Sequence, residues 1–148
     1  MSWSNTYIGI PKLDLGRTAE GADCWGLTHL IYREELGVTL PEYLGYGSTK
    51  EHGEIAALIA GAAATPLWVP VSGPAIAFDI SVFRRGRLSS HVGIVVRHGL
   101  MIHMGNDHAV LEDYRHGPWA RRLTGHWRYV DRARRQPVPV QILSEARR

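Results

Sequence analysis

Apolar residues recur at helical spacing in the N-terminal half of the chain. Leu27 and Ile31 stand at positions i and i+4, as on a helix with one buried face. Asp23 precedes this run as a typical N-cap, and Gly37 follows it as a typical C-terminal stop. The pattern therefore predicts a helix over residues 24–36.

A second apolar stripe follows a connection at residues 40–47. Four of its positions keep helical spacing: Ile55, Leu58, Ile59 and Ala62. Ser48 and Glu51 stand three residues apart, which is the spacing of a capping box at a helix start. Thr65-Pro66 ends the stripe. We expect a second helix between these signals.

The C-terminal half changes to short β-rich runs separated by turn residues. The runs predict five strands, at residues 77–84, 91–96, 100–104, 109–114 and 126–131. Helices followed by consecutive antiparallel strands indicate the α+β class, with the N-terminal helices packed on an antiparallel β-sheet.

Length and composition fit one globular domain. The chain has 148 residues, which suffices for a single core, and we assign residues 1–131 to it. Residues 132–148 are rich in Arg and contain Pro, and we expect them to form a basic tail. No apolar run approaches the ~18 residues that span a bilayer, so we expect no membrane insertion.

The formal net charge is +3, and the excess is concentrated near the C-terminus. Such local basicity suits nucleic acid, an anionic wall polymer or an acidic patch on another protein, and charge alone does not separate these. The sequence has neither paired zinc-ligand cysteines nor an aromatic RNP stretch, so we expect no nucleic-acid partner. The first six residues lack the basic start and apolar core of a secretory signal.

Cys24 is the only cysteine and falls in the first turn of the predicted helix. Unpaired N–H groups and the positive end of the helix dipole favour a thiolate there. With a histidine nearby, the pKa of this thiol would fall below its ordinary value. A free cysteine is also a common small core residue, and the local sequence does not exclude that interpretation.

Two histidines in the β half test the reactive interpretation. If residues 97–99 form a three-residue hairpin loop, Val96 pairs with Leu100 and Gly93 with His103. His91 and His103 then share a face as diagonal neighbours, with their rings within hydrogen-bond reach. A two-residue loop would place them on opposite faces.

On a shared face the three side chains can act as nucleophile, base and orienting group. His91 would take the proton of Cys24 and remain as an imidazolium beside the thiolate, and His103 would fix the tautomer of His91. The backbone N–H of Cys24 is a candidate oxyanion donor. Ordinary core or surface histidines, or a Cys-His-His metal site, are the alternatives, although no paired-Cys or HExxH spacing supports a metal. We expect no metal and no cofactor.

The residues match a known pattern. Asp23-Cys24-Trp25-Gly26-Leu27, then His91-Val92-Gly93-Ile94, then His103 resemble the NlpC-type cell-wall cysteine peptidases, which have a papain-like fold. Trp25, Tyr32-Arg33-Glu34 and Leu40-Pro41 look most like the branch encoded by tailed bacteriophages and gene-transfer agents for their tail tips.

The resemblance implies hydrolysis of amide bonds in peptidoglycan peptide stems through a thioester on Cys24. By the same resemblance His91 is the base and His103 the orienting residue. Many members carry a tyrosine after the Gly-x-Pro of the N-terminal loop, where this chain has Lys12. Further candidates for the substrate or oxyanion position are Tyr7, Lys12, Trp25 and Gly93, the last because it adds no side chain opposite His103.

The tail-tip resemblance also implies a location and partners. We expect a protein made in the bacterial cytoplasm without a signal peptide, carried on a virion tail or gene-transfer-agent particle, and acting on the host wall in the periplasm. Its partners would be peptidoglycan and tail-tip or hub proteins. The alternatives are a structural tail-tip component with an idle site, or an amidase or acyltransferase that uses the same thioester.

Overall fold

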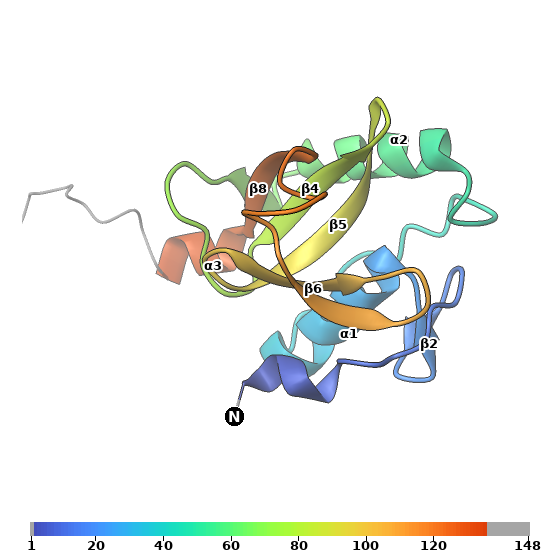
Figure 1. The fold of residues 1–148 in the computed structure, drawn as a ribbon. Helices are drawn as coiled ribbons and strands as arrows, with labels where there is room; N and C mark the ends of the chain where they lie inside the picture. Colours follow the sequence, from blue (N-terminus) through green and yellow to red (C-terminus); the bar gives the residue numbers. More distant parts are fainter. Residues whose placement is uncertain (1, 136–148) are drawn as a thin grey trace, which may run out of the picture.

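The structure, a computed structural model, describes residues 2–135 (Figure 1). Besides a 3-10 turn, η1 (Trp3–Thr6), it contains three helices: α1 (Cys24–Leu36), α2 (His52–Ala63) and α3 (Val130–Arg135). The strands are β1 (Arg17–Thr18), β2 (Gly21–Ala22), β3 (Trp68–Pro70), β4 (Ile80–Arg85), β5 (Leu88–Arg97), β6 (Leu100–Met104), β7 (Ala109–Asp113) and β8 (Leu123–Tyr129).

The central feature is a six-stranded sheet of order β3-β8-β4-β5-β6-β7, in which every neighbouring pair is antiparallel. Strands β1 and β2 form a separate two-stranded sheet before α1. Figure 1 shows α1 beneath the β6–β7 hairpin and α2 across the top of the sheet. The α+β class and the packing of the N-terminal helices on an antiparallel sheet are confirmed.

Helix α1 has the predicted bounds because its signals are local. Asp23 is extended and its side chain accepts from the N–H of Gly26, so it caps the helix start. Gly37 ends the helix in the left-handed conformation, at φ 66°, and its N–H bonds back to the last turn.

Helix α2 begins later than predicted, and the expected capping box is wrong. The N-cap is Glu51, without a side-chain cap hydrogen bond. Ser48 Oγ accepts from the N–H of Lys50, and the Glu51 carboxylate accepts from the N–H of Gly47. Both side chains therefore stabilise the turn before the helix rather than its first N–H groups.

The strand predictions are correct in order but not in all bounds. β5 starts three residues earlier than predicted, and β3 was not predicted. The expected strand over 126–131 is wrong at its end, because the chain turns into α3 at Val130, whose N–H donates to the carbonyl of Leu67. The proposed tail boundary at residue 132 lies within α3, and residues 136–148 lie outside the described part.

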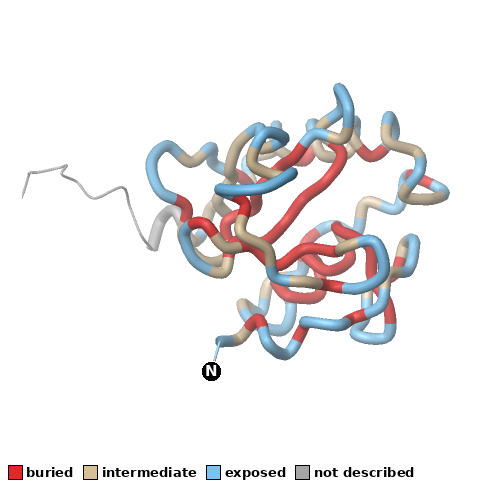
Figure 2. Tube along the Cα trace, viewed as in Figure 1, coloured by how far each residue is buried: buried red, intermediate tan, exposed pale blue. Residues whose placement is uncertain are grey.

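Each sheet face has its own buried cluster. The larger cluster joins α1 to one face, through residues such as Leu27, Ile31, Val92 and Ile94. The smaller cluster covers the other face and includes Phe83, Val95, Met101 and Tyr114. Figure 2 shows the buried stretch along β5 and through α1. No helix within residues 2–135 has the length and hydropathy to cross a membrane.

Candidate active site

Cys24 is the first residue of α1, and a buried carboxylate holds the helix start in place. Asp23 Oδ1 accepts from the N–H of Gly26 at 2.8 Å and from Arg17 Nη1 at 2.9 Å. Asp23 Oδ2 accepts from the Tyr46 hydroxyl. Since the carboxylate is fully engaged, the position of Cys24 is fixed by charge pairing as well as by capping.

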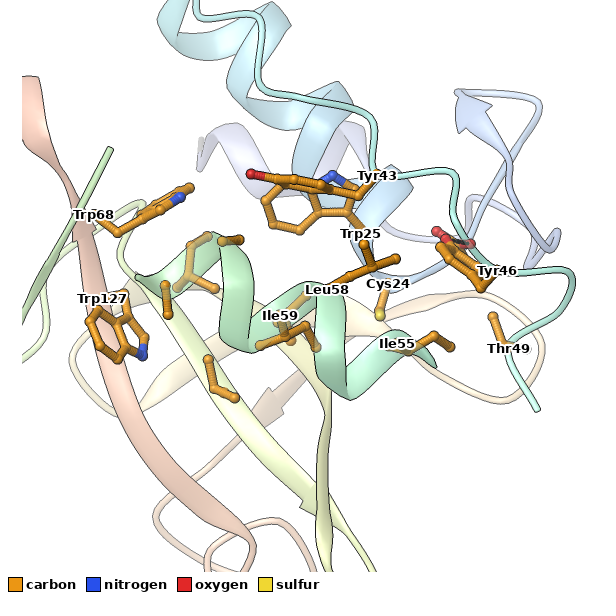
Figure 3. A pocket seen from close by; sticks show the side chains of 16 residues that line it. Cys24, Trp25, Tyr43, Tyr46, Thr49, Ile55, Leu58, Ile59, Trp68 and Trp127 are labelled. Carbon is orange, nitrogen blue, oxygen red and sulfur yellow. Dashed lines mark hydrogen bonds between the residues drawn. The ribbon is translucent and has the colours of Figure 1, made fainter. Parts of the chain in front are cut away.

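The thiol faces an apolar cavity between the start of α1, helix α2 and the sheet (Figure 3). The cavity has an empty volume of about 640 Å³, including its opening to solvent. Ile55, Leu58 and Ile59 of α2 line it, and Trp68 and Trp127 lie at its far end (Figure 3). Val92 of β5 also lines it, so the thiol lies beside the strand that carries His91.

Burial raises the pKa of the Cys24 thiol, and the charge of Asp23 raises it further. The backbone N–H groups of Val92 and Trp25 and the charge of Arg85 lower it by less. The expectation of a lowered thiol pKa is therefore wrong for this resting structure. Desolvation by burial raises the pKa of the thiol by more than the N–H groups at the helix start lower it.

The β5–β6 hairpin reaches the predicted histidine pairing by a different route. Gly93 pairs with His103 as expected, but Leu100 pairs with Arg97. The loop is thus one residue shorter than predicted, and a bulge at Val96 absorbs the extra residue. The two departures cancel, which keeps both histidines on one face.

A row of four polar side chains crosses that face. Arg85 Nη2 lies 3.0 Å from His91 Nδ1, and His91 Nε2 lies 2.8 Å from His103 Nδ1. His103 Nε2 in turn lies 2.8 Å from Glu112 Oε1. A guanidinium only donates, so Nδ1 of His91 accepts, and the rest of the row is fixed: His91 donates to His103, and His103 donates to Glu112.

Both histidines are buried, and burial lowers the pKa of each. The charges of Arg85, His103 and Arg122 lower the pKa of His91 further. With the thiol pKa raised and the His91 pKa lowered, the resting pair is neutral rather than the expected thiolate and imidazolium. Within the described residues no hydrogen bond joins Cys24 to His91, and Arg85 takes the Nδ1 lone pair instead.

Trp119 covers the histidine pair. Its ring stacks on His91 with centroids 4.7 Å apart and meets His103 edge-on at 5.2 Å. The sequence motifs described above include neither Trp119 nor Arg85 nor Glu112. A signal existed for Glu112: His103 pairs with Val110, so a residue two positions further along β7 shares its face.

Two of the further candidate residues are not where the sequence suggested. The hydroxyl of Tyr7 donates to Glu34 and Glu35 near the end of α1. That is about 16 Å along the helix from Cys24, so Tyr7 as oxyanion donor is wrong. Gly93 does not leave room for substrate, since an added Cβ would meet Met101 Sδ at 2.6 Å.

The other two candidates lie at the margin of the cavity. Lys12 Nζ donates to Thr49 Oγ1 at 2.8 Å and pairs with Asp14 at 3.0 Å, and Thr49 lines the cavity. Trp25 lines the cavity too, and its Nε1 donates to the carbonyl of Pro41 at 2.8 Å. The part of the chain that the structure describes contains no His, Cys, Asp or Glu group arranged to hold a metal ion.

Solved structures of similar fold come from bacterial proteins. A NlpC/P60 family protein from Bacillus cereus matches with a TM-score of 0.58 and 23% identity over 84% of this chain. An NLP/P60 family protein from Staphylococcus aureus, described as similar to lipoprotein, matches with a TM-score of 0.56 and 22% identity over 86% of this chain. This chain covers only 37% and 39% of those two chains.

The NlpC/p60 domain of the peptidoglycan hydrolase SagA matches with a TM-score of 0.52 and 20% identity, over 76% of this chain and 84% of that domain. Among curated protein sequences none matches. The sequence model of the NlpC/P60 family matches residues 14–128, which span α1, the histidine row and most of the sheet. The chain therefore belongs to the NlpC/P60 family.

Proposed function

We propose that the protein is a cysteine peptidase that hydrolyses amide bonds in the peptide stems of peptidoglycan. The observation that carries the proposal is the hydrogen-bonded row His91–His103–Glu112. Its first residue, His91, precedes Val92 on β5, and Val92 lines the same cavity as the Cys24 thiol. Family membership and the fold shared with a peptidoglycan hydrolase domain support the substrate class.

In the proposed reaction His91 Nδ1 accepts the proton of Cys24, and the sulfur attacks the amide carbonyl carbon. The tetrahedral intermediate collapses with cleavage of the C–N bond, and the imidazolium gives its proton to the leaving amine. Water then attacks the thioester with His91 as base, which releases the carboxylic acid and restores the thiol.

The surroundings suit these steps. His103 and Glu112 hold His91 in the tautomer whose unprotonated nitrogen is Nδ1, and they stabilise the imidazolium. The N–H of Cys24 belongs to the first turn of α1, where N–H groups lack intrahelical acceptors, and is our candidate oxyanion donor. The apolar cavity shields the thioester from bulk water.

The decisive test compares the purified protein with its Cys24→Ala variant on intact peptidoglycan. We expect the wild type to release new amino groups and the variant to release none. Equal release by both proteins would overturn the assignment. Added peptide amines separate a hydrolase from an acyltransferase, because only the transferase would pass most of its thioester to the amine.

We further propose that the enzyme is carried on a phage or gene-transfer-agent tail tip and meets peptidoglycan in the periplasm of the host. The support is the sequence resemblance at Trp25 and Leu40-Pro41, which are joined by the hydrogen bond from Trp25 to Pro41. Mass spectrometry of purified particles tests this proposal: the chain should copurify with tail or hub proteins. Its absence from washed particles would contradict a tail location.

A structural tail-tip component with an idle site is the second candidate, favoured by the neutral resting state of Cys24 and His91. Particles that carry Cys24→Ala separate the two candidates. An idle site predicts unchanged infection or gene delivery, whereas the enzyme predicts a loss.

A further inference from the structure

The Arg85 guanidinium is hydrogen-bonded to Nδ1 of His91, which is the atom that would act as the catalytic base. Arg85 follows Phe83 by two residues on β4, and Phe83 pairs with His91 on β5. A bulge between Phe83 and Arg84 leaves Ser90 as the extra residue, and the Arg85 guanidinium lies 3.0 Å from His91 Nδ1. While that contact lasts, the lone pair that would receive the Cys24 proton is taken.

The Arg85 end of the row lacks negative charge. Within residues 2–135 the structure gives Arg85 no carboxylate partner, and His91 is its only side-chain hydrogen-bond partner. Arg122, the other cation acting on His91, lies over the Trp119 ring at 5.2 Å and has no carboxylate partner there either. The one carboxylate of the row, Glu112, is at the opposite end, beyond His103.

Arg85 also acts on the thiol, because its charge lowers the pKa of Cys24. A half-buried guanidinium with unused donors, in contact with the proposed base, is a typical binding site for a carboxylate, which it can hold by two parallel hydrogen bonds. The missing anion would therefore belong to a bound molecule.

We propose that Arg85 is a specificity residue that binds a free carboxylate next to the scissile amide, and that this ion pair withdraws the guanidinium from His91. The freed Nδ1 then accepts the proton of Cys24, so that the base is released only when a carboxylate-bearing peptide is bound. The inference rests on the proposed peptidase function and extends it to the choice of substrate.

Two matched peptides test the proposal by kinetics. They share one sequence, and the group beside the scissile amide is a free carboxylate in one and a carboxamide in the other. We expect the wild type to favour the carboxylate peptide about tenfold or more in kcat/KM. Arg85→Met should bring the ratio close to one, by losing activity on the carboxylate peptide and gaining activity on the carboxamide peptide.

Arg87→Met is the control, since Arg87 is exposed on the same hairpin and its loss changes the net charge equally. It should keep the wild-type preference. A gain on the carboxamide peptide is the informative result, because damage to the fold would lower both activities. The proposal is overturned if Arg85→Met keeps the preference or if the wild type shows none.

A binding measurement separates this inference from the hydrolase assignment. In Cys24→Ala protein both peptides stay intact, and the ¹⁵N resonance of His91 Nδ1 reports whether that nitrogen accepts a hydrogen bond. The carboxylate peptide should move it toward the value of a free imidazole nitrogen, and the carboxamide peptide should not. A selective shift without hydrolysis by the wild type would uphold carboxylate binding by Arg85 and overturn the peptidase. Hydrolysis without a selective shift would do the reverse.

Discussion

On the helix side of the candidate site the charges next to Cys24 are paired, whereas on the sheet side the cation next to His91 has no carboxylate partner in the described part of the chain. Asp23 and Arg17 form an ion pair of 2.9 Å, with side chains 1% and 9% exposed. Arg85 is half-buried and contacts a neutral imidazole. The helix side has its charges paired without a ligand, whereas on the sheet side Arg85 has no carboxylate partner within residues 2–135.

The two sides also differ in how the chain builds them. The helix side comes mostly from one stretch, residues 15–26, in which Asp23 accepts from Leu15, Arg17 and Gly26. The sheet side takes one residue from each of four strands, β4 to β7. The local side can serve as a rigid mount for the proposed nucleophile, while the assembled side holds the proposed base in a form that a ligand can change.

The largest expected effect comes from breaking the buried ion pair on the helix side. Asp23→Ala removes the helix cap and leaves the Arg17 charge buried without its partner. We expect the free energy of unfolding to fall by about 3–5 kcal/mol, measured by urea denaturation. Asp14→Ala is the control, because its pair with Lys12 is exposed and should contribute no more than about 1 kcal/mol. Equal losses in the two variants would show that the buried charge does not fix this side.

The next largest effect comes from removing His103 from the hydrogen-bonded row on the sheet side. His103→Leu leaves the Nε2–H of His91 without its acceptor, so the orientation of His91 and its imidazolium lose support. We expect kcat on stem peptides to fall about 100-fold. His103→Gln keeps an acceptor oxygen and should stay within about tenfold of the wild type.

A purely structural role for His103 makes a different prediction. It would reduce the folded fraction and leave the pH profile of kcat unchanged, whereas a positioning role shifts the profile in the leucine variant. Thermal unfolding measured on the same samples gives the folded fraction. An unchanged profile with normal kcat per folded molecule would contradict the role of the row.

The same contrast explains what the sequence could and could not predict. The bounds of α1 follow from Asp23 and Gly37, which act on their own neighbours. The contact between His91 and His103 was predictable from hairpin register, although the loop was wrong and the bulge at Val96 compensated. The roles of Arg85 and Trp119 were not, because a bulge in β4–β5 and packing from a distant segment bring them to His91.

The environment of the thiol was also beyond local reasoning. A helix start favours a thiolate, and that expectation considers only residues near Cys24. The cavity wall that desolvates the sulfur comes from α2, more than 25 residues later in the chain, and from β5. Nothing in the Asp23-Cys24-Trp25 motif indicates that Ile55 would line a cavity beside the thiol.

The smallest expected effect is on the pKa of the Cys24 thiol. It tests whether the surroundings of the thiol on the helix side are apolar. Because burial raises the pKa of Cys24, the thiolate forms at higher pH, and alkylation by iodoacetamide should have its midpoint above the ordinary value of about 8.5. Ile55→Ser admits water to the cavity and should lower that midpoint by up to about one pH unit. Ile8→Ser, at an exposed isoleucine, should leave it unchanged. A wild-type midpoint below 8.5 would contradict the raised pKa of the thiol, and a midpoint below pH 7 would mean that Cys24 rests as a thiolate.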